Sequence, residues 1–305
     1  MNREPAAIAR RIQEALETTK VSFALTGAVL FGSAATARAE AHSDVDLLVV
    51  GRGLPVKRHR RAREIAEVKR LLPGVPLDVL LLTLEEVESN FRNHNPLFLD
   101  IAEDGILILD REGILARAIQ ETHRYVGERG IARTDQGWRF PVDLGVPTLL
   151  SKVSNWDFAR GMLGDAERDR RVGERLLEDG FYDKAVYHYQ QAVEKAVKAV
   201  LIVLGIFQKT HLVGAILREV VQHGERLTER WREPLLEAAS ISEELEPEVS
   251  LSRYPGIVND ALWLPSEEYG RDDAEAAEAK AAKAVTIAER FVKDWCHSRT
   301  PGGPA

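Results

Sequence analysis

The chain lacks several features that mark secreted, membrane and nucleic-acid-coating proteins. Its 305 residues include one cysteine, Cys296, so no disulfide can form within the chain, and this usage is typical of a reducing cytoplasm. The amino terminus has no apolar signal core, and the longest apolar run, Ala199 to Phe207, is far shorter than the roughly 20 residues that cross a bilayer. The net charge of −7 gives no global reason to expect nucleic-acid binding. We therefore predict a cytoplasmic protein without a membrane segment.

The residues that are present indicate a globular protein. A hydrophobic content of 45% and a charged content of 29% are ordinary for folded domains. A length of 305 residues allows about two domains, each with its own core.

Three aspartates occur at the starts of two apolar runs. Asp44 and Asp46 flank a single residue at the beginning of the run 45–50. If this run is a β-strand, both carboxylates project from one face, because side chains alternate along a strand. Neighbouring carboxylates repel unless a cation compensates them, and Mg²⁺ takes oxygen ligands from one or two carboxylates and from substrate phosphates. The next predicted strand, 76–82, adds a third carboxylate at Asp78.

A glycine and a serine precede this acidic pair. Gly32 allows the backbone to approach a ligand closely, and Ser33 adds a hydroxyl group that can bond phosphate oxygens. A Gly-Ser turn, an Asp-x-Asp pair and a later Asp, in this order, resemble the minimal nucleotidyltransferases of the DNA polymerase β superfamily. The alternative interpretation is an antiparallel hairpin whose acidic edge is merely solvated.

The resemblance implies roles for individual residues. Asp44, Asp46 and Asp78 would be catalytic and would bind two Mg²⁺ ions, and Asp78 would also help to activate the attacking group. The residues expected to bind the nucleotide are Gly32, Ser33, Arg38 and Ser43. The chain departs from the family pattern at Thr36 and Ala37, where many members have Arg and Gly. This restricts the loop, and Arg38 could supply the missing charge.

Hydrophobic periodicity predicts the helices and strands of residues 1–128, and the resemblance implies that they form an α+β fold, a small mixed sheet with flanking helices. The expected elements are a helix at 5–18, strands at 21–31 and 76–82, a helix at 56–72, a helix from Thr83, a helix before Gly105, a strand at 106–109 and a helix at 113–128. The helix at 56–72 carries seven basic and two acidic residues. We interpret them as a solvated helix face rather than a nucleic-acid site, since no aromatic residues are interleaved.

The second part of the chain is predicted to be mainly helical. Residues 129–154 are rich in glycine and proline and are expected to link two domains, with Trp138 pinning the linker to a surface. Residues 155–297 contain long amphipathic segments, which predict an all-α up-and-down bundle. The tail 298–305 is rich in Gly and Pro and is expected to be disordered.

Four segments of this bundle resemble the HEPN domain that accompanies minimal nucleotidyltransferases, fused or as a separate subunit. They are residues 185–199, Gly205, residues 209–212 and residues 252–255. The resemblance implies a toxin–antitoxin or defence context and is compatible with a homodimer through the bundle. Many HEPN domains are ribonucleases in which an Arg precedes a His by a short fixed interval.

Arg253 is the natural candidate for this Arg, but no histidine follows it at that interval. Arg253 could instead contact a phosphate, and Tyr254 could stack on a base or accept a nucleotidyl group. The alternative is that Tyr254 caps the bundle beside a turn.

The leading hypothesis is an Mg²⁺-dependent nucleotidyltransferase. It would move a nucleoside monophosphate, with AMP from ATP expected, onto a hydroxyl of an unidentified acceptor, which could be a protein, an RNA end or a small molecule. A second hypothesis is a non-catalytic regulator that senses a nucleotide and acts through the HEPN bundle. A HEPN ribonuclease is the least favoured reading.

Overall fold

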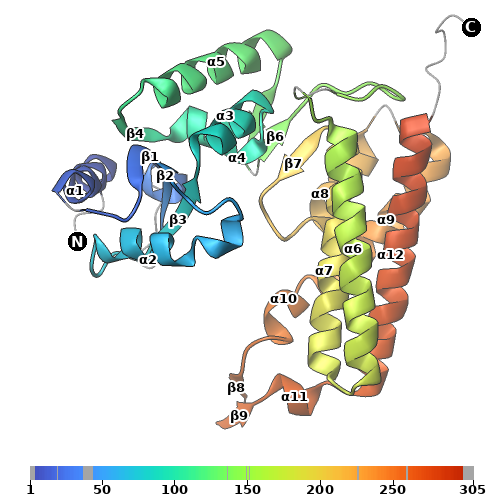
Figure 1. Cartoon of the computed structure of the whole chain (residues 1–305). Coiled ribbons are helices and arrows are strands. Elements are labelled where there is room, and N and C mark those ends of the chain that lie inside the picture. The colour runs from blue at the N-terminus through green and yellow to red at the C-terminus, as the bar shows by residue number, and fades with distance from the viewer. Residues whose placement is uncertain are drawn as a thin grey trace, which may run out of the picture. The chain divides into compact units, whose positions relative to one another are not determined.

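A computed structural model describes residues 4–18, 20–36, 44–135, 137–148, 150, 152–224, 227–258 and 260–297 (Figure 1). The chain divides into two units. Unit 1 comprises Met1–Gly130 and Leu150–Lys152, and unit 2 comprises Ile131–Leu149 and Val153–Ala305. In the part of the chain that is described, no helix combines the length and the apolar character needed to cross a membrane.

Unit 1 is built on a mixed sheet with the strand order β3-β2-β1-β4. Strand β1 is antiparallel to β2 and to β4, whereas β2 and β3 are parallel, because a helical crossover connects them. The strands are β1 (Ala24–Phe31), β2 (Val45–Arg52), β3 (Leu77–Leu82) and β4 (Ile106–Asp110).

Helices cover both faces of this sheet. One face packs on α1 (Pro5–Thr18) and α2 (Ala62–Arg70) around side chains such as Ile12, Leu47 and Val68. The other face packs on α3 (Leu84–Arg92), α4 (Pro96–Asp104) and α5 (Ile114–Arg129). The predicted α+β fold with flanking helices is therefore confirmed, and the apolar runs of the strands are buried because both faces are covered.

The prediction of one helix over 56–72 is wrong at its amino-terminal end. The structure has a short 3₁₀ turn, η2 (Arg58–Arg60), and α2 begins only at Ala62. The physical reason is Arg61, whose side chain turns inward and donates hydrogen bonds to the carbonyls of Pro55 and Val56 at 2.8 and 3.3 Å. These bonds hold residues 55–56 as a loop against the Arg61 side chain.

Two helix starts follow from local capping. At the predicted start of the helix from Thr83, the Thr83 hydroxyl accepts from the Glu86 amide and the Glu86 carboxylate accepts from the Thr83 amide, which forms a capping box. Asn95 caps α4 through a hydrogen bond from the Leu97 amide. Asparagine is among the residues preferred at this position.

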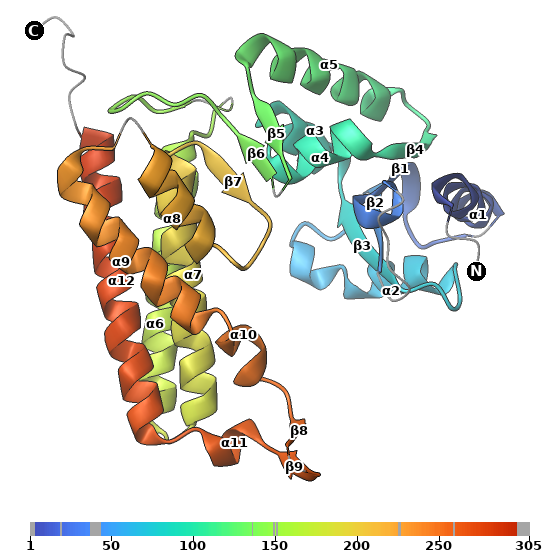
Figure 2. The ribbon, with the colours of Figure 1, turned by 180° about the vertical axis from the view of Figure 1, so that it is seen from behind.

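Unit 2 is a helical bundle, as predicted (Figure 2). Its helices are α6 (Asn155–Glu178), α7 (Tyr182–Val203), α8 (Gly214–His223), α9 (Glu229–Leu245), the short α10 (Glu248–Leu251) and α11 (Pro265–Glu268), and α12 (Arg271–His297). Helix α7 lies at the centre and contacts α6, α9 and α12. Most of its side chains are buried, so the apolar stripe expected from the sequence widens to nearly the whole circumference.

Short strands add to the bundle, and the sequence did not predict them. Strands β5 (Ala132–Thr134) and β6 (Gly137–Arg139) form a three-stranded sheet with β7 (Ile206–Gln208), which follows α7. Much of the segment expected as a linker therefore belongs to unit 2. The reason is its apolar content, since Trp138 and Phe140 are each only 2% exposed.

A second small sheet is a hairpin of β8 (Gly256–Val258) and β9 (Ala261–Trp263). The expected tail, 298–305, lies outside the described residues.

Candidate active site

The sheet of unit 1 brings two of the predicted aspartates side by side. In the parallel pairing of β2 and β3, Asp46 is the register partner of Asp78. Their neighbours Leu47 and Val79 are buried in the core under α1 and α2, so the two carboxylates project from the opposite face of the sheet. Asp46 is half-buried and Asp78 is exposed, which leaves both carboxylates accessible to a ligand.

Gly32 lies directly against Asp46. It follows Phe31, the last residue of β1, and begins the 3₁₀ turn η1 (Gly32–Ala34) with φ +71°, a conformation that favours glycine. A Cβ atom at this position would overlap Oδ2 of Asp46 and approach its Cγ at 2.9 Å. Gly32 of the Gly-Ser turn and Asp46 of the Asp-x-Asp pair, which are separated in sequence, therefore lie in close contact.

The departure at Thr36 has a structural consequence. The Thr36 hydroxyl donates to the carbonyls of Gly32 and Ser33 at 3.4 and 3.3 Å, so it closes the turn that carries both residues. An arginine at this position has no short hydroxyl group and could not make this side-chain bond in the same way. Thr36, where many family members have arginine, therefore stabilises η1 through hydrogen bonds within the turn.

Other predicted site residues are placed less fully. Asp44 is exposed and lies one residue before β2. Arg38, Ser43 and Ala37 fall outside the described residues. In the described ranges, no three acidic, His or Cys side chains gather closely enough to hold a metal ion by themselves. Asp46 and Asp78 nevertheless match the ordinary Mg²⁺ pattern, in which one or two carboxylates share the ion with substrate phosphates.

A buried arginine is a feature of this unit that the sequence reasoning missed. The Arg61 side chain is 1% exposed and donates to the Leu81 carbonyl at 3.0 Å and to the two Glu86 oxygens at 2.6 and 3.1 Å. Burial alone would raise the pKa of Glu86, but hydrogen bonds from Arg61, the Thr83 amide and Arg58 outweigh it and lower the pKa to about 2.

This network also bears on the basic segment 57–70. Arg58 and Arg61 both bind Glu86, and Arg63 pairs with Glu67. These contacts favour a structural role over a nucleic-acid site for the three arginines. Within the run, nothing in the sequence separates Arg61 from its exposed neighbours, so only its burial reveals its role.

The HEPN-like loop places Arg253 between two aromatic rings. Its guanidinium carbon lies 5.1 Å from the ring centre of Tyr187 and 4.9 Å from that of Tyr254. The contact to Tyr187, which comes from α7, could not be read from the sequence. Across the described ranges, no hydrogen bond, ion pair or ring contact joins Arg253 to a histidine, whereas His188 is bound to Asp169 at 3.0 Å.

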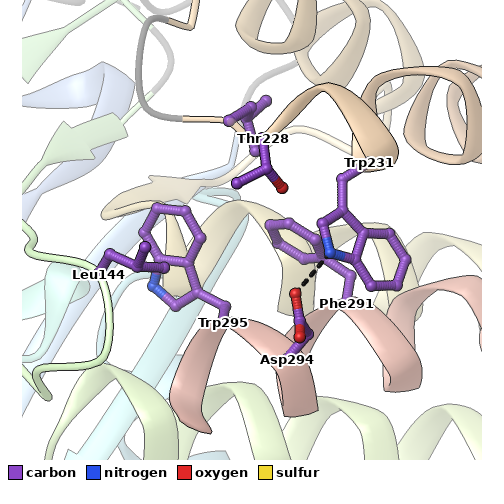
Figure 3. Close-up of a pocket in the computed structure, with 7 residues that line it drawn as sticks. Leu144, Thr228, Trp231, Phe291, Asp294 and Trp295 are labelled. Atoms are coloured by element: carbon purple, nitrogen blue, oxygen red, sulfur yellow. Dashed lines mark hydrogen bonds between the residues drawn. The ribbon is translucent and has the colours of Figure 1, made fainter. Parts of the chain in front are cut away.

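A separate pocket in unit 2 contains none of the predicted site residues (Figure 3). Trp231, Phe291 and Trp295 form its aromatic walls, and the Trp231 indole donates to Asp294 at 2.6 Å. Burial would raise the pKa of Asp294, but hydrogen bonds from Trp231 and Arg230 lower it. Because this carboxylate is already bound by protein groups, the pocket offers a ligand little beyond its aromatic walls.

Comparison with known families assigns both parts of the chain. Residues 10–107 match the nucleotidyltransferase domain model, and residues 159–297 match the HEPN domain model. Two curated relatives come from Methanocaldococcus jannaschii. "Putative toxin MJ1304" is 37% identical over 140 residues, which cover 46% of this chain and 91% of the relative. "Putative protein adenylyltransferase MJ1305" is 31% identical over 106 residues, which cover 33% of this chain and 71% of the relative.

Among solved structures, a nucleotidyltransferase-like protein from Exiguobacterium sibiricum aligns with 95% of this chain and 74% of its own. The sequence identity is 13% and the TM-score is 0.38.

Proposed function

The chain belongs to the nucleotidyltransferase and HEPN families, with one domain of each, and from this premise we propose that it transfers a nucleoside monophosphate from an NTP to an acceptor hydroxyl. The observation that carries the proposal is the register of Asp46 beside Asp78 with Gly32 packed on Asp46. A transferase of this class needs carboxylates next to a turn that lets phosphates approach closely.

The residues take the following roles in this proposal. Gly32 and Ser33 would hold the phosphates through close backbone approach and the serine hydroxyl, with Arg38 and Ser43 as further contacts. Asp44, Asp46 and Asp78 would hold two Mg²⁺ ions, which when bound neutralise the triphosphate and lower the pKa of the attacking oxygen. Asp78, the more exposed member of the strand pair, would orient the acceptor hydroxyl.

The reaction balances without a further reactant. The acceptor oxygen forms a bond to the α-phosphorus, the bond from that phosphorus to the pyrophosphate oxygen breaks, and the hydroxyl proton is released. The name of one relative, a protein adenylyltransferase, supports ATP as the donor, and the name of the other, a toxin, supports a toxin–antitoxin context. A protein side chain such as the exposed Tyr254, an RNA end and a small molecule all fit as acceptors.

Labelled nucleotides test the proposal directly. The full chain is incubated with each α-labelled NTP and Mg²⁺, alone and with cell extract. Wild type is compared with Asp46→Asn and Asp78→Asn, and with Asp272→Asn, which removes an exposed carboxylate of α12. We expect transfer by wild type and by Asp272→Asn, and a loss of at least about 100-fold in the two strand variants. Equal labelling by all four proteins would exclude this site.

A second candidate function is nucleotide sensing without transfer, and the replacement of the usual Arg and Gly by Thr36 and Ala37 is the observation that favours it. The same experiment separates the two functions. Metal-dependent NTP binding that is lost in Asp46→Asn, with no label transferred to any acceptor, would support the regulator.

A further inference from the structure

Three aromatic side chains of unit 2 line a small pocket that lies apart from the candidate active site (Figure 3). Phe291 lies between Trp231 and Trp295, with its ring centre 5.4 and 5.8 Å from theirs. The three rings come from α9 and α12, and Leu144 and Thr228 also line the pocket. A pocket of this small size suits a single side chain better than a large ligand.

The two indole groups differ in how their N–H donors are used. Nε1 of Trp231 donates to Asp294 at 2.6 Å. Trp295 is only 3% exposed, and its Nε1 has no hydrogen-bond acceptor among the residues that the structure describes. A buried donor without an acceptor is costly, and folded proteins rarely leave one. The Trp295 N–H therefore points to an acceptor that a ligand brings.

A surface turn covers the pocket on the side of this nitrogen. Leu144 lines the pocket there, and its side chain is apolar and half-buried (Figure 3). The turn is held by the Val146 amide, which donates to the Asp143 carbonyl at 3.2 Å. A carbonyl group can therefore reach the Trp295 N–H by displacing one apolar side chain, and no helix of the bundle has to move.

The chemistry of the pocket suits a proline. Grooves lined with aromatic rings bind extended segments that contain proline. The proline ring packs on the aromatic rings, and the backbone carbonyls of such a segment are not used in hydrogen bonds of their own. A buried indole N–H is a donor that one of these carbonyls can accept from. The pocket therefore fits a proline together with an adjacent carbonyl.

The chain has such a segment next to the pocket. Residues 298–305 lie outside the described ranges, and their sequence is Ser-Arg-Thr-Pro-Gly-Gly-Pro-Ala. They follow His297, the last residue of α12, and Trp295 lies about 3 Å before His297 along the helix axis. Pro301 comes four residues after His297, and four extended residues span up to about 14 Å. Pro301 is therefore within reach of the three rings.

We propose that this pocket binds the chain's own carboxyl-terminal tail, residues 298–305. Pro301 packs against the aromatic rings, and an adjacent carbonyl accepts from Nε1 of Trp295. A segment tethered so close to its site has an effective concentration of millimolar order, so a contact that is weak for a free peptide is sufficient. This contact does not depend on the transferase activity.

The first test records the indole N–H signals of the full chain by NMR after labelling with ¹⁵N-tryptophan. Pro301→Ala should shift the signals of Trp295 and Trp231 and leave the other three tryptophan signals unchanged. A chain that ends at His297 should show the same two shifts. Ser298→Ala is the matched control, because it changes the tail but keeps its proline, and its spectrum should match that of wild type.

Two outcomes of this test overturn the proposal. One is a Pro301→Ala spectrum in which the Trp295 and Trp231 signals stay at their wild-type positions. The other is a wild-type spectrum in which these two signals move on dilution, because the pocket would then hold the tail of a second copy.

The second test measures how fast trypsin removes the tail at Arg299, relative to cleavage at Arg290 inside α12, so that unfolding is not mistaken for release. Cleavage follows the population of the released tail. Trp295→Phe removes the N–H but keeps a ring, and it should raise the relative rate about three- to tenfold.

Trp156→Phe is the matched control for this variant. Within the described ranges Nε1 of Trp156 is also buried without an acceptor, but Trp156 does not line the pocket. Its relative cleavage rate should equal that of wild type. Equal rates in Trp295→Phe and Trp156→Phe would overturn the assigned hydrogen bond.

Discussion

Gly32 is the residue at which the Gly-Ser turn meets the carboxylate of Asp46. Its positive φ and the absence of room for a Cβ beside Asp46 are two separate constraints, and only glycine meets both. The first constraint is common to several glycines of the chain. The second is what ties this glycine to the candidate active site.

Gly32→Ala should therefore abolish nucleotidyl transfer, because the new methyl group displaces the Asp46 carboxylate. The matched control is Gly53→Ala, since Gly53 has φ +79° but no atom within 4 Å of the added carbon. Both variants should lose about 1–2 kcal/mol of stability from the left-handed backbone. Only Gly32→Ala should lose activity, measured with α-labelled ATP. Equal activity of the two variants would show that the contact with Asp46 is dispensable.

The ion pair of Arg61 and Glu86 makes unit 1 sensitive to acid. The folded pKa of Glu86 is about 2, below its ordinary value of 4.5. A depressed carboxylate pKa contributes stability above pH 4.5, and this contribution is lost as the pH falls from 4.5 toward 2. The loss matters structurally because Arg61 joins the 55–56 loop, the end of β3 and the start of α3.

Glu86→Gln should destabilise this region by about 2–3 kcal/mol at pH 7, and the difference from wild type should shrink as the pH approaches 2. Hydrogen exchange of peptides that cover β3 and α3 measures this effect, after correction for intrinsic rates. Glu112→Gln is the control, because its partner Arg52 is 55% exposed and solvent screening should make the effect of this substitution much smaller. A difference that is independent of pH would contradict the assigned titration of Glu86.

At the scale of elements, the packing of α6 on α7 depends on a small residue. Tyr189 of α7 is completely buried, and a Cβ at Gly173 of α6 would lie 2.6 Å from Cε1 of its ring. Two other glycines of α6, Gly161 and Gly164, have open space around them. A Gly→Ala substitution is therefore expected to have opposite effects on stability at different glycines of this helix.

Gly173→Ala should destabilise unit 2 by about 1–3 kcal/mol, because overpacking against Tyr189 exceeds the gain in helix propensity. Gly164→Ala should stabilise it by about 0.5–1 kcal/mol, since only the propensity term applies. Urea unfolding followed by tryptophan fluorescence measures both, because all five tryptophans lie in unit 2. A stabilising Gly173→Ala would mean that α6 can shift away from Tyr189.

At the scale of the whole molecule, the two units carry different chemistry. Unit 1 contains the carboxylates of the candidate active site, and unit 2 contains the aromatic pocket and Arg253. Ligand binding that is confined to one unit should be visible as protection of that unit alone, since a ligand stabilises the state to which it binds.

Adding ATP and Mg²⁺ to the full chain should slow hydrogen exchange in peptides covering β1, η1 and β2, by about tenfold or more at saturating nucleotide. Peptides from the centre of α7 should be unaffected. Asp46→Asn should abolish the protection, and Asp272→Asn should retain it. Protection in α7 with none in unit 1 would place the nucleotide in the HEPN domain instead.

Some features of this chain depend on local signals and others on long-range contacts. The strands with their aspartates, the capping box at Thr83 and the helices of unit 2 follow from periodicity and residue type over a few positions. The burial of Trp138 depends on pairing with β7. The burial of Arg61 depends on Glu86, which is 25 positions away. The position of Arg253 likewise depends on a distant residue, Tyr187, whose ring contacts its guanidinium group.

Strand alternation and short motifs are set by neighbouring residues, so the two domain families and the order of the residues expected to carry the chemistry could be predicted from the amino-acid sequence. The folded structure was needed to establish that Asp46 is the register partner of Asp78 and that Gly32 has no room for a side chain. It also decided which arginine is buried and which apolar residues remain exposed. Burial depends on contacts between segments far apart in the chain, and a local pattern does not contain them.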